Sequence, residues 1–123
     1  MRFMMIYKPA DTKDMEAGVP PSQDEMMAMG RFIGEMAKSG VLLATDGLLP
    51  TSKGARVRLA KGKLSVTDGP FTESKELIAG FAIVQTKSKA EAIALAERFL
   101  KIAGDGESEI RQMYDAPAYP PAG

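Results

Sequence analysis

The sequence contains no histidine and no cysteine. The absence of cysteine excludes disulfide bonds, thiol nucleophiles and thiolate-bound metals. The absence of histidine removes the commonest metal ligand, the usual general base near neutral pH, and every triad that depends on an imidazole. We therefore expect no metal site and no cofactor, and any acid–base chemistry has to rely on carboxylates.

The chain also lacks a charge excess and a long apolar run. Lysine plus arginine and aspartate plus glutamate both number 16, whereas a nucleic-acid-binding surface needs clustered basic residues. No apolar run approaches the roughly 20 residues that span a bilayer, and residues 1–7 are too short for the apolar core of a signal peptide. We expect a cytoplasmic protein without nucleic-acid or membrane partners.

Two sequence patterns of the capping-box type predict helices. Ser22-Gln23-Asp24-Glu25 and Ser88-Lys89-Ala90-Glu91 each place a hydroxyl and a carboxylate where they can satisfy free amides at a helix start. Apolar residues then recur at helical spacing after each box. Gly40 and Gly104 are the expected ends of these helices.

Apolar and alternating segments predict the strands. The expected strands cover residues 2–7, 41–44, 55–60, 64–66, 77–86 and 107–114. Lys61-Gly62 joins the third and fourth of them as a two-residue hairpin turn. The element order is therefore β-α-β, hairpin, β-α-β. This order predicts one α+β domain over residues 1–115, a ferredoxin-like split β-α-β fold with an inserted hairpin, and a proline-rich tail over 116–123.

This arrangement places both helices on one face of the sheet. The strands 2–7, 41–44 and 77–86 are nevertheless apolar on both of their alternating sets. A large exposed apolar face is unusual for a monomer. We therefore expect a homodimer in which two sheets pack face to face into a barrel-like core.

One stretch carries a family resemblance. Residues 66–76, Val-Thr-Asp-Gly-Pro-Phe-Thr-Glu-Ser-Lys-Glu, followed by Gly80-Phe81, resemble the signature of the YCII-related, DGPF-domain proteins. Matches at residues 4–7, 40–42 and 109–111 extend the resemblance over residues 1–115. The resemblance implies a dimeric α/β-barrel, in agreement with the order of the elements.

The resemblance implies less about function. Most members are uncharacterised, and many DGPF proteins are encoded beside extracytoplasmic-function sigma factors. The wider group is suspected of enzymatic activity because a histidine and an aspartate lie at a pocket between sheet and helix. In this chain the histidine position falls near Met29.

Asp68, in the Asp-Gly-Pro turn, is the first candidate site residue. Its carboxylate is either a turn cap, because aspartate is favoured in turns, or a pocket group that acts as a general acid or base. Glu73 and Lys75 follow the turn. They form a solvated face or reach back over the turn to a polar ligand.

Three further candidates lie at the end of the sheet where the first two strands finish. Asp46 follows the second strand, and Tyr7 and Lys8 end the first. Ligands are often bound at strand ends of this kind. Tyr7 is equally explained as a core or rim residue whose hydroxyl bonds locally.

Three functions remain open from the sequence. The preferred hypothesis is a homodimer that binds a small polar molecule, or serves a regulatory role, through a pocket near Asp68 under the loop 8–21. A second hypothesis is a small enzyme that uses Asp68 as its acid or base. A third is an accessory protein that contacts an extracytoplasmic-function sigma factor, which rests on the family's gene neighbourhood alone.

Overall fold

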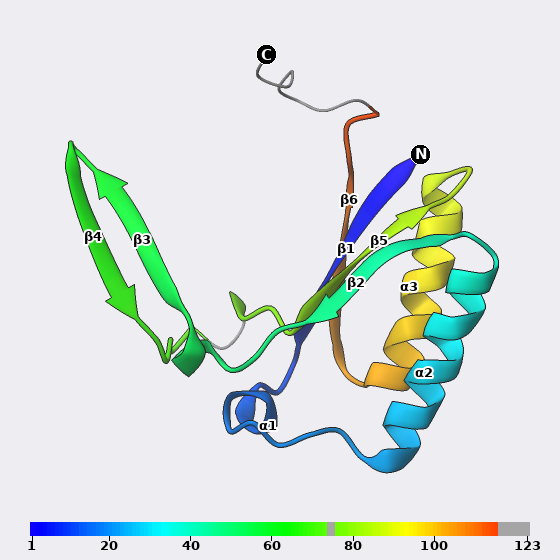
Figure 1. Ribbon diagram of the computed structural model, residues 1–123, viewed down its shortest axis with the longest axis horizontal. Coiled ribbons are helices and arrows are strands. Elements are labelled where there is room, and N and C mark those ends of the chain that lie inside the picture. The colour runs from blue at the N-terminus through cyan, green and yellow to red at the C-terminus, as the bar shows by residue number, and fades with distance from the viewer. Residues whose placement is uncertain (74–75, 116–123) are drawn as a thin grey trace.

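A computed structural model describes residues 1–73 and 76–115 (Figure 1). The elements in chain order are β1 (Arg2–Pro9), α1 (Lys13–Glu16), α2 (Gln23–Lys38), β2 (Leu42–Gly47), the 3₁₀ turn η1 (Thr51–Lys53), β3 (Ala55–Ala60), β4 (Lys63–Asp68), β5 (Gly80–Gln85), α3 (Lys89–Ala103) and β6 (Gly106–Gln112). The expected proline-rich tail, 116–123, lies outside the described residues.

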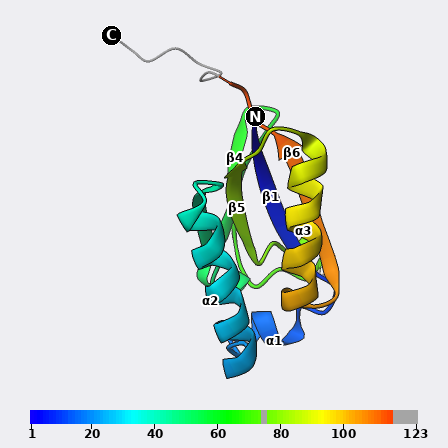
Figure 2. The ribbon, with the colours of Figure 1, turned by 90° about the vertical axis from the view of Figure 1, so that its right-hand side faces the viewer.

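The main sheet has the strand order β2-β5-β1-β6, and neighbouring strands run antiparallel. The two β-α-β halves therefore interleave, since β5 lies between β1 and β2 and β1 lies between β5 and β6. Helices α2 and α3 cover one face of this sheet (Figure 2). The predicted ferredoxin-like α+β fold with an inserted hairpin is confirmed.

Both predicted helix starts use their serine as a cap. The Ser22 hydroxyl accepts a hydrogen bond from the Glu25 amide at 3.1 Å, and the Ser88 hydroxyl accepts one from the Glu91 amide at 3.2 Å. The Glu91 carboxylate also accepts from the Lys87 amide at 2.9 Å. These contacts satisfy amides that have no partner within the helix and so fix where α2 and α3 begin.

The core lies between the helices and one face of the sheet. Phe3 and Met5 of β1 and Val84 of β5 are buried there, with Ala92 and Ala96 of α3 above them. The strand register pairs Phe3 with Val84, so both side chains point to the same face. This packing holds β1 and β5 rigidly beneath the helices.

The opposite face of the sheet is apolar at its centre and is covered by no described helix. The register pairs Met4 with Ile83 and Ile6 with Phe81, which places all four side chains on that face. Each of them is only half-buried. We call this surface, Met4, Ile6, Phe81 and Ile83, the open sheet face.

Strands β3 and β4 form a two-stranded hairpin, residues 55–68, which we call the arm. Its turn residues Lys61 and Gly62 both have positive φ, 49° and 79°, as the predicted two-residue hairpin turn requires. The arm stands on the side of the sheet away from the helices (Figure 1). Every residue of its two strands is exposed.

The Asp-Gly-Pro-Phe run joins the arm to the body through hydrogen bonds that its backbone amides donate. The Gly69 amide donates to the Gly54 carbonyl at 3.0 Å, and the Phe71 amide donates to the Thr51 hydroxyl at 3.0 Å. Glu16 of α1 accepts bonds from both the amide and the hydroxyl of Thr51. This stretch therefore ties η1, α1 and the base of the arm together.

The loop expected over residues 8–21 is partly ordered as regular structure. Strand β1 continues to Pro9, and the short helix α1 occupies Lys13–Glu16. Four residues make little more than one turn, which is too short for an apolar period to show in the sequence. Helix α1 supplies Glu16, which bonds to Thr51 at the base of the arm.

Candidate functional site

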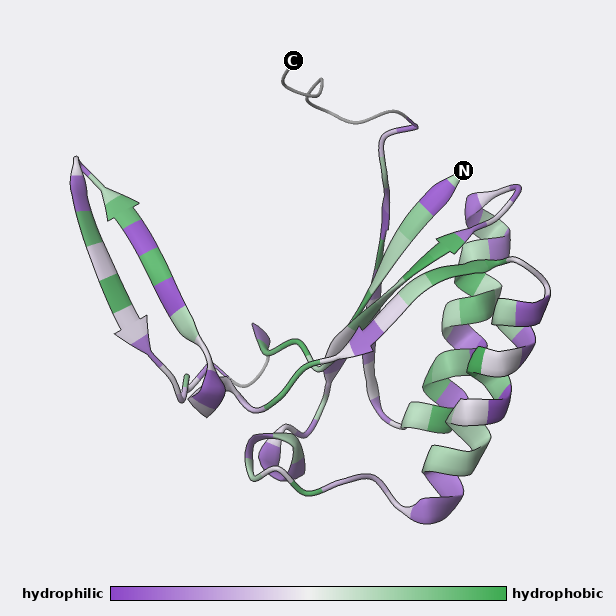
Figure 3. Cartoon of the chain, viewed as in Figure 1, coloured by the Kyte–Doolittle hydropathy of each residue, from purple (hydrophilic) through white to green (hydrophobic). Residues whose placement is uncertain are grey.

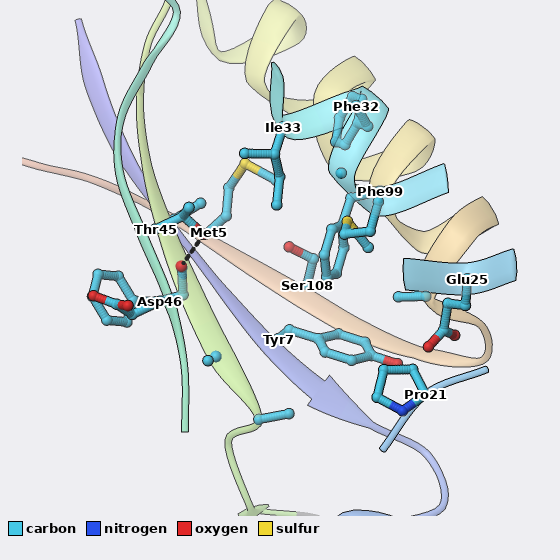
Figure 4. A pocket seen from close by; sticks show the side chains of 18 of the residues that line it. Met5, Tyr7, Pro21, Glu25, Phe32, Ile33, Thr45, Asp46, Phe99 and Ser108 are labelled. Atoms are coloured by element: carbon cyan, nitrogen blue, oxygen red, sulfur yellow. Dashed lines mark hydrogen bonds between the residues drawn. The ribbon is translucent and has the colours of Figure 1, made fainter. Parts of the chain in front are cut away.

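A cavity of about 490 Å³ lies between α2 and the helix-facing side of the sheet (Figure 4). Its wall is mainly apolar. Met29, Ile33 and Met36 of α2 form one side, Met5 of β1 forms another, and Phe99 reaches in from α3. Helix α2 presents these residues together because they recur at three- and four-residue spacing on one stripe.

Two polar side chains point into the cavity from neighbouring strands. The register places Tyr7 of β1 directly opposite Ser108 of β6, and both line the cavity. The Ser108 hydroxyl oxygen is buried and has no hydrogen-bond partner among the described residues. A buried hydroxyl without a partner is unfavourable, so a molecule in the cavity that bonded to it would gain affinity.

Tyr7 is held rigidly. Its ring meets the Phe99 ring edge-on, with centroids 5.0 Å apart and an interplanar angle of 79°. Burial raises the pKa of Tyr7 above its ordinary value of 10.0, and the nearby Glu25 and Asp105 carboxylates raise it further. The phenol is therefore protonated at neutral pH and available as a hydrogen-bond donor beside Ser108.

Three more polar residues border the cavity. Glu25 enters from the first turn of α2, and Thr45 enters from the edge strand β2. Asp46 follows Thr45, but its carboxylate points to the open sheet face, because the register pairs Asp46 with Phe81 (Figure 4). The Thr45 hydroxyl donates to the Phe81 carbonyl at 2.9 Å (Figure 4), so its hydrogen is already used. Glu25 adds an acceptor at the cavity's polar margin.

The sequence candidates divide between the cavity and other surfaces. Tyr7 points into the cavity, whereas Asp46 borders it with its carboxylate directed to the open sheet face. Asp68 does not line the cavity, because it ends β4 at the base of the arm, is exposed, and pairs with Ala55 across the hairpin. Within residues 1–73 and 76–115 this cavity does not include Asp68, so the hypothesis that Asp68 lines a ligand site stays a prediction.

Lys8 and Glu73 make ion pairs outside the cavity. The Lys8 ammonium lies 3.0 Å from the Glu109 carboxylate, and this bond raises the pKa of Lys8 and lowers that of Glu109. Glu73 pairs with Arg56 at 3.1 Å, beside the Phe71 ring over which the guanidinium lies at 3.8 Å. Lys75 lies outside the described residues.

Sequence reasoning missed Ser108 and Glu25 as cavity residues. Glu25 was assigned to the capping box, and Ser108 is one polar residue in an alternating strand. Neither has a local signal, because the cavity forms only when β6 and α2 pack around β1. Met29, which the resemblance aligned with the family's histidine, lies on the α2 wall of the cavity.

Within residues 1–73 and 76–115, no cluster of three or more carboxylate side chains is placed to hold a metal ion. Of the helices in the same residues, none has the length and apolar character needed to cross a membrane.

A family model described as the YCII-related domain matches residues 1–115. The chain belongs to the YCII-related family. A protein of similar sequence is the uncharacterised protein R00369 of Rhizobium meliloti (strain 1021), which is 37% identical over 59 residues. That alignment covers 48% of each chain, so this YCII-related chain matches about half of the relative's length.

A solved structure shares the fold of this YCII-related chain. It is the 5-chloro-2-hydroxyhydroquinone dehydrochlorinase (TftG) of Burkholderia phenoliruptrix AC1100, in complex with 2,5-dihydroxybenzoquinone. The TM-score is 0.53 at 14% sequence identity, and the match covers 94% of this chain and 96% of the other. At that identity the likeness establishes the fold.

Proposed function

We propose that this YCII-related protein binds a small, mainly apolar molecule that carries hydroxyl or carbonyl groups. The observation that carries the proposal is the buried, unpartnered Ser108 hydroxyl in a cavity whose wall is otherwise apolar. Ligand pockets combine these features, with a hydrophobic lining and a few polar groups that fix orientation.

The polar groups define what the ligand has to offer. Ser108 can donate or accept, the neutral Tyr7 phenol can donate, and Glu25 can accept. A ring with two oxygen substituents meets all three requirements. At about 490 Å³ the cavity is within the range of small-molecule sites, about 300–1,000 Å³, and the complex of TftG with 2,5-dihydroxybenzoquinone makes hydroxylated rings the first probes.

This proposal changes the ligand expected from the sequence. A small polar molecule would leave most of the Met29, Ile33 and Met36 wall without favourable contacts. The enzymatic alternative, with Asp68 as acid or base, requires another copy of the chain to bring that carboxylate to the cavity. The sigma-factor alternative stays a prediction that rests on the gene neighbourhood of DGPF proteins.

We also propose that the chain forms a homodimer through the open sheet face. The open sheet face exposes apolar side chains from adjacent strands, and burying such a surface against an identical one is a common way to form a two-fold dimer. Sedimentation of the purified protein tests this directly. A dimer is expected, and a monomer at micromolar concentration contradicts it.

Binding itself is tested by calorimetry and thermal shift with hydroxylated benzoquinones and catechols. We expect saturable binding that Met29→Phe weakens, because the rigid ring narrows the space between α2 and the sheet. Asp68→Asn is the comparison variant and is expected to bind like the parent. If Asp68→Asn loses binding while Met29→Phe keeps it, the cavity proposal is wrong and the Asp68 hypothesis is favoured.

A further inference from the structure

The arm carries an apolar stripe that the described chain leaves uncovered. Val57 pairs directly with Val66, and Leu59 with Leu64, so all four side chains lie on one face of the hairpin. They are 71%, 66%, 68% and 74% exposed, in that order. We call these four residues the arm stripe.

The other face of the arm is polar. It pairs Arg56 with Thr67 and Arg58 with Ser65. The arm is therefore amphipathic, with the alternation of a hairpin that has one face against protein and one in water. A two-stranded hairpin is marginally stable by itself, so this pattern indicates that the arm stripe has a protein surface to pack on.

The position of the arm indicates which surface that is. The arm stands on the side of the sheet away from α2 and α3, the same side as the open sheet face (Figures 1 and 2). The segment between β2 and the arm contains Leu48 and Leu49, which are 50% and 76% exposed. The polar residues 51–54 separate these leucines from the arm stripe, so the two are distinct exposed apolar groups (Figure 3).

We propose that the arm stripe packs on a second copy of this chain, the copy whose sheet covers the open sheet face. The inference rests on the homodimer proposed above. A copy in that position lies on the arm's side of the molecule. Because the dimer has two-fold symmetry, each arm packs on the other subunit. Formation of the dimer then covers both the open sheet face and the arm stripe of each chain.

The dimensions agree with this arrangement. Six residues at about 3.3 Å each give an arm about 20 Å long, whereas packed sheets lie about 10 Å apart. The arm is thus long enough to pass the facing sheet and lie against the body of the second copy. Its polar face, with Arg56 and Arg58, then remains toward solvent.

The absence of cysteine makes a thiol-protection experiment direct. Leu59→Cys places a single thiol on the arm stripe, and Arg58→Cys places one on the opposite face of the same strand. In the dimer, we expect a maleimide to label the Leu59→Cys protein at least tenfold more slowly than the Arg58→Cys protein. Dilution below the dimer's dissociation constant is expected to remove the difference.

A second measurement needs no introduced thiol. Leu59→Ser combined with Leu64→Ser weakens the arm stripe, and Arg58→Ser with Ser65→Ala changes the polar face as a matched control. We expect the first pair to raise the dimer dissociation constant at least tenfold and the control to change it less than twofold. Circular dichroism of both verifies that the body remains folded.

The outcomes separate this inference from the proposals on which it rests. A dimer in which both thiols react equally fast, and in which the paired serines leave dissociation unchanged, overturns the role of the arm and leaves the homodimer standing. A monomer overturns both. Ligand binding in the cavity is measured independently, so its failure is distinguishable from either result.

Discussion

The carbonyl oxygen of Thr51 lies where a Cβ atom on Gly69 would be. The Gly69 amide is at the same time hydrogen-bonded to the Gly54 carbonyl at 3.0 Å. The glycine of the Asp-Gly-Pro-Phe run is therefore required by a close backbone contact at the base of the arm. This contact gives the Asp-Gly-Pro-Phe run a structural explanation that does not involve the cavity.

Gly69→Ala is expected to lower the free energy of unfolding by about 1–3 kcal/mol, the usual range for forcing extra atoms into packed protein. Gly34→Ala is the control, since a Cβ at that helix position would have nothing within 4 Å. It should stabilise the protein by about 0.5–1 kcal/mol, because alanine favours a helix interior. Urea unfolding of both variants measures the difference, and equal effects would refute the contact.

Thr51→Val tests the junction through its hydroxyl. That hydroxyl donates to Glu16 and accepts from the Phe71 amide, and valine keeps the shape but removes both bonds. We expect a loss of about 1–3 kcal/mol, because the half-buried Phe71 amide and Glu16 carboxylate each lose a hydrogen-bond partner. Thr51→Ser should recover most of it in the same unfolding assay. A valine variant as stable as the parent would show that the two bonds are dispensable.

Ser108→Ala should affect stability and binding differently. Its hydroxyl is buried without a partner, so removing it should leave the ligand-free protein unchanged or slightly more stable. Ligand affinity should fall about fivefold, which corresponds to one lost hydrogen bond of about 1 kcal/mol. Ser65→Ala, on the polar face of the arm, is the matched control for both measurements. Unaltered affinity in Ser108→Ala would remove the main support for the cavity proposal.

Tyr7 should govern stability at alkaline pH. Its folded-state pKa is raised above the ordinary 10.0, so the unfolded chain loses that proton first. The free energy of unfolding should therefore decline as pH rises past 10.0, and the decline should be smaller in Tyr7→Phe. Tyrosinate absorbance should likewise lose its most alkaline step in that variant. A Tyr7 that titrates at or below the ordinary value would contradict its burial.

The elements of the fold were predictable because their signals are local. The capping serines Ser22 and Ser88, the Lys61-Gly62 turn and the alternating apolar segments each act within a few residues. Interleaving of the two halves followed from their order. These features specify the sheet and the two long helices without any knowledge of contacts between distant segments.

The cavity was not predictable in the same way. Tyr7 and Ser108 lie opposite each other although about a hundred residues separate them, and neither has a distinctive neighbour in the sequence. Asp68 was favoured because the Asp-Gly-Pro turn indicates an unusual backbone. A turn signal does not distinguish a ligand site from a close contact such as that between Gly69 and Thr51.

The chain enters and leaves the arm at a single point, where Gly54 and Gly69 are hydrogen-bonded neighbours. Because the two ends of the arm lie side by side, the arm can change in length or in sequence while the path of the remaining chain stays the same. Changes in the arm and changes in the cavity wall are therefore separable during evolution. If the arm sets the assembly and the cavity selects the ligand, as proposed above, relatives can change one of these properties while keeping the other.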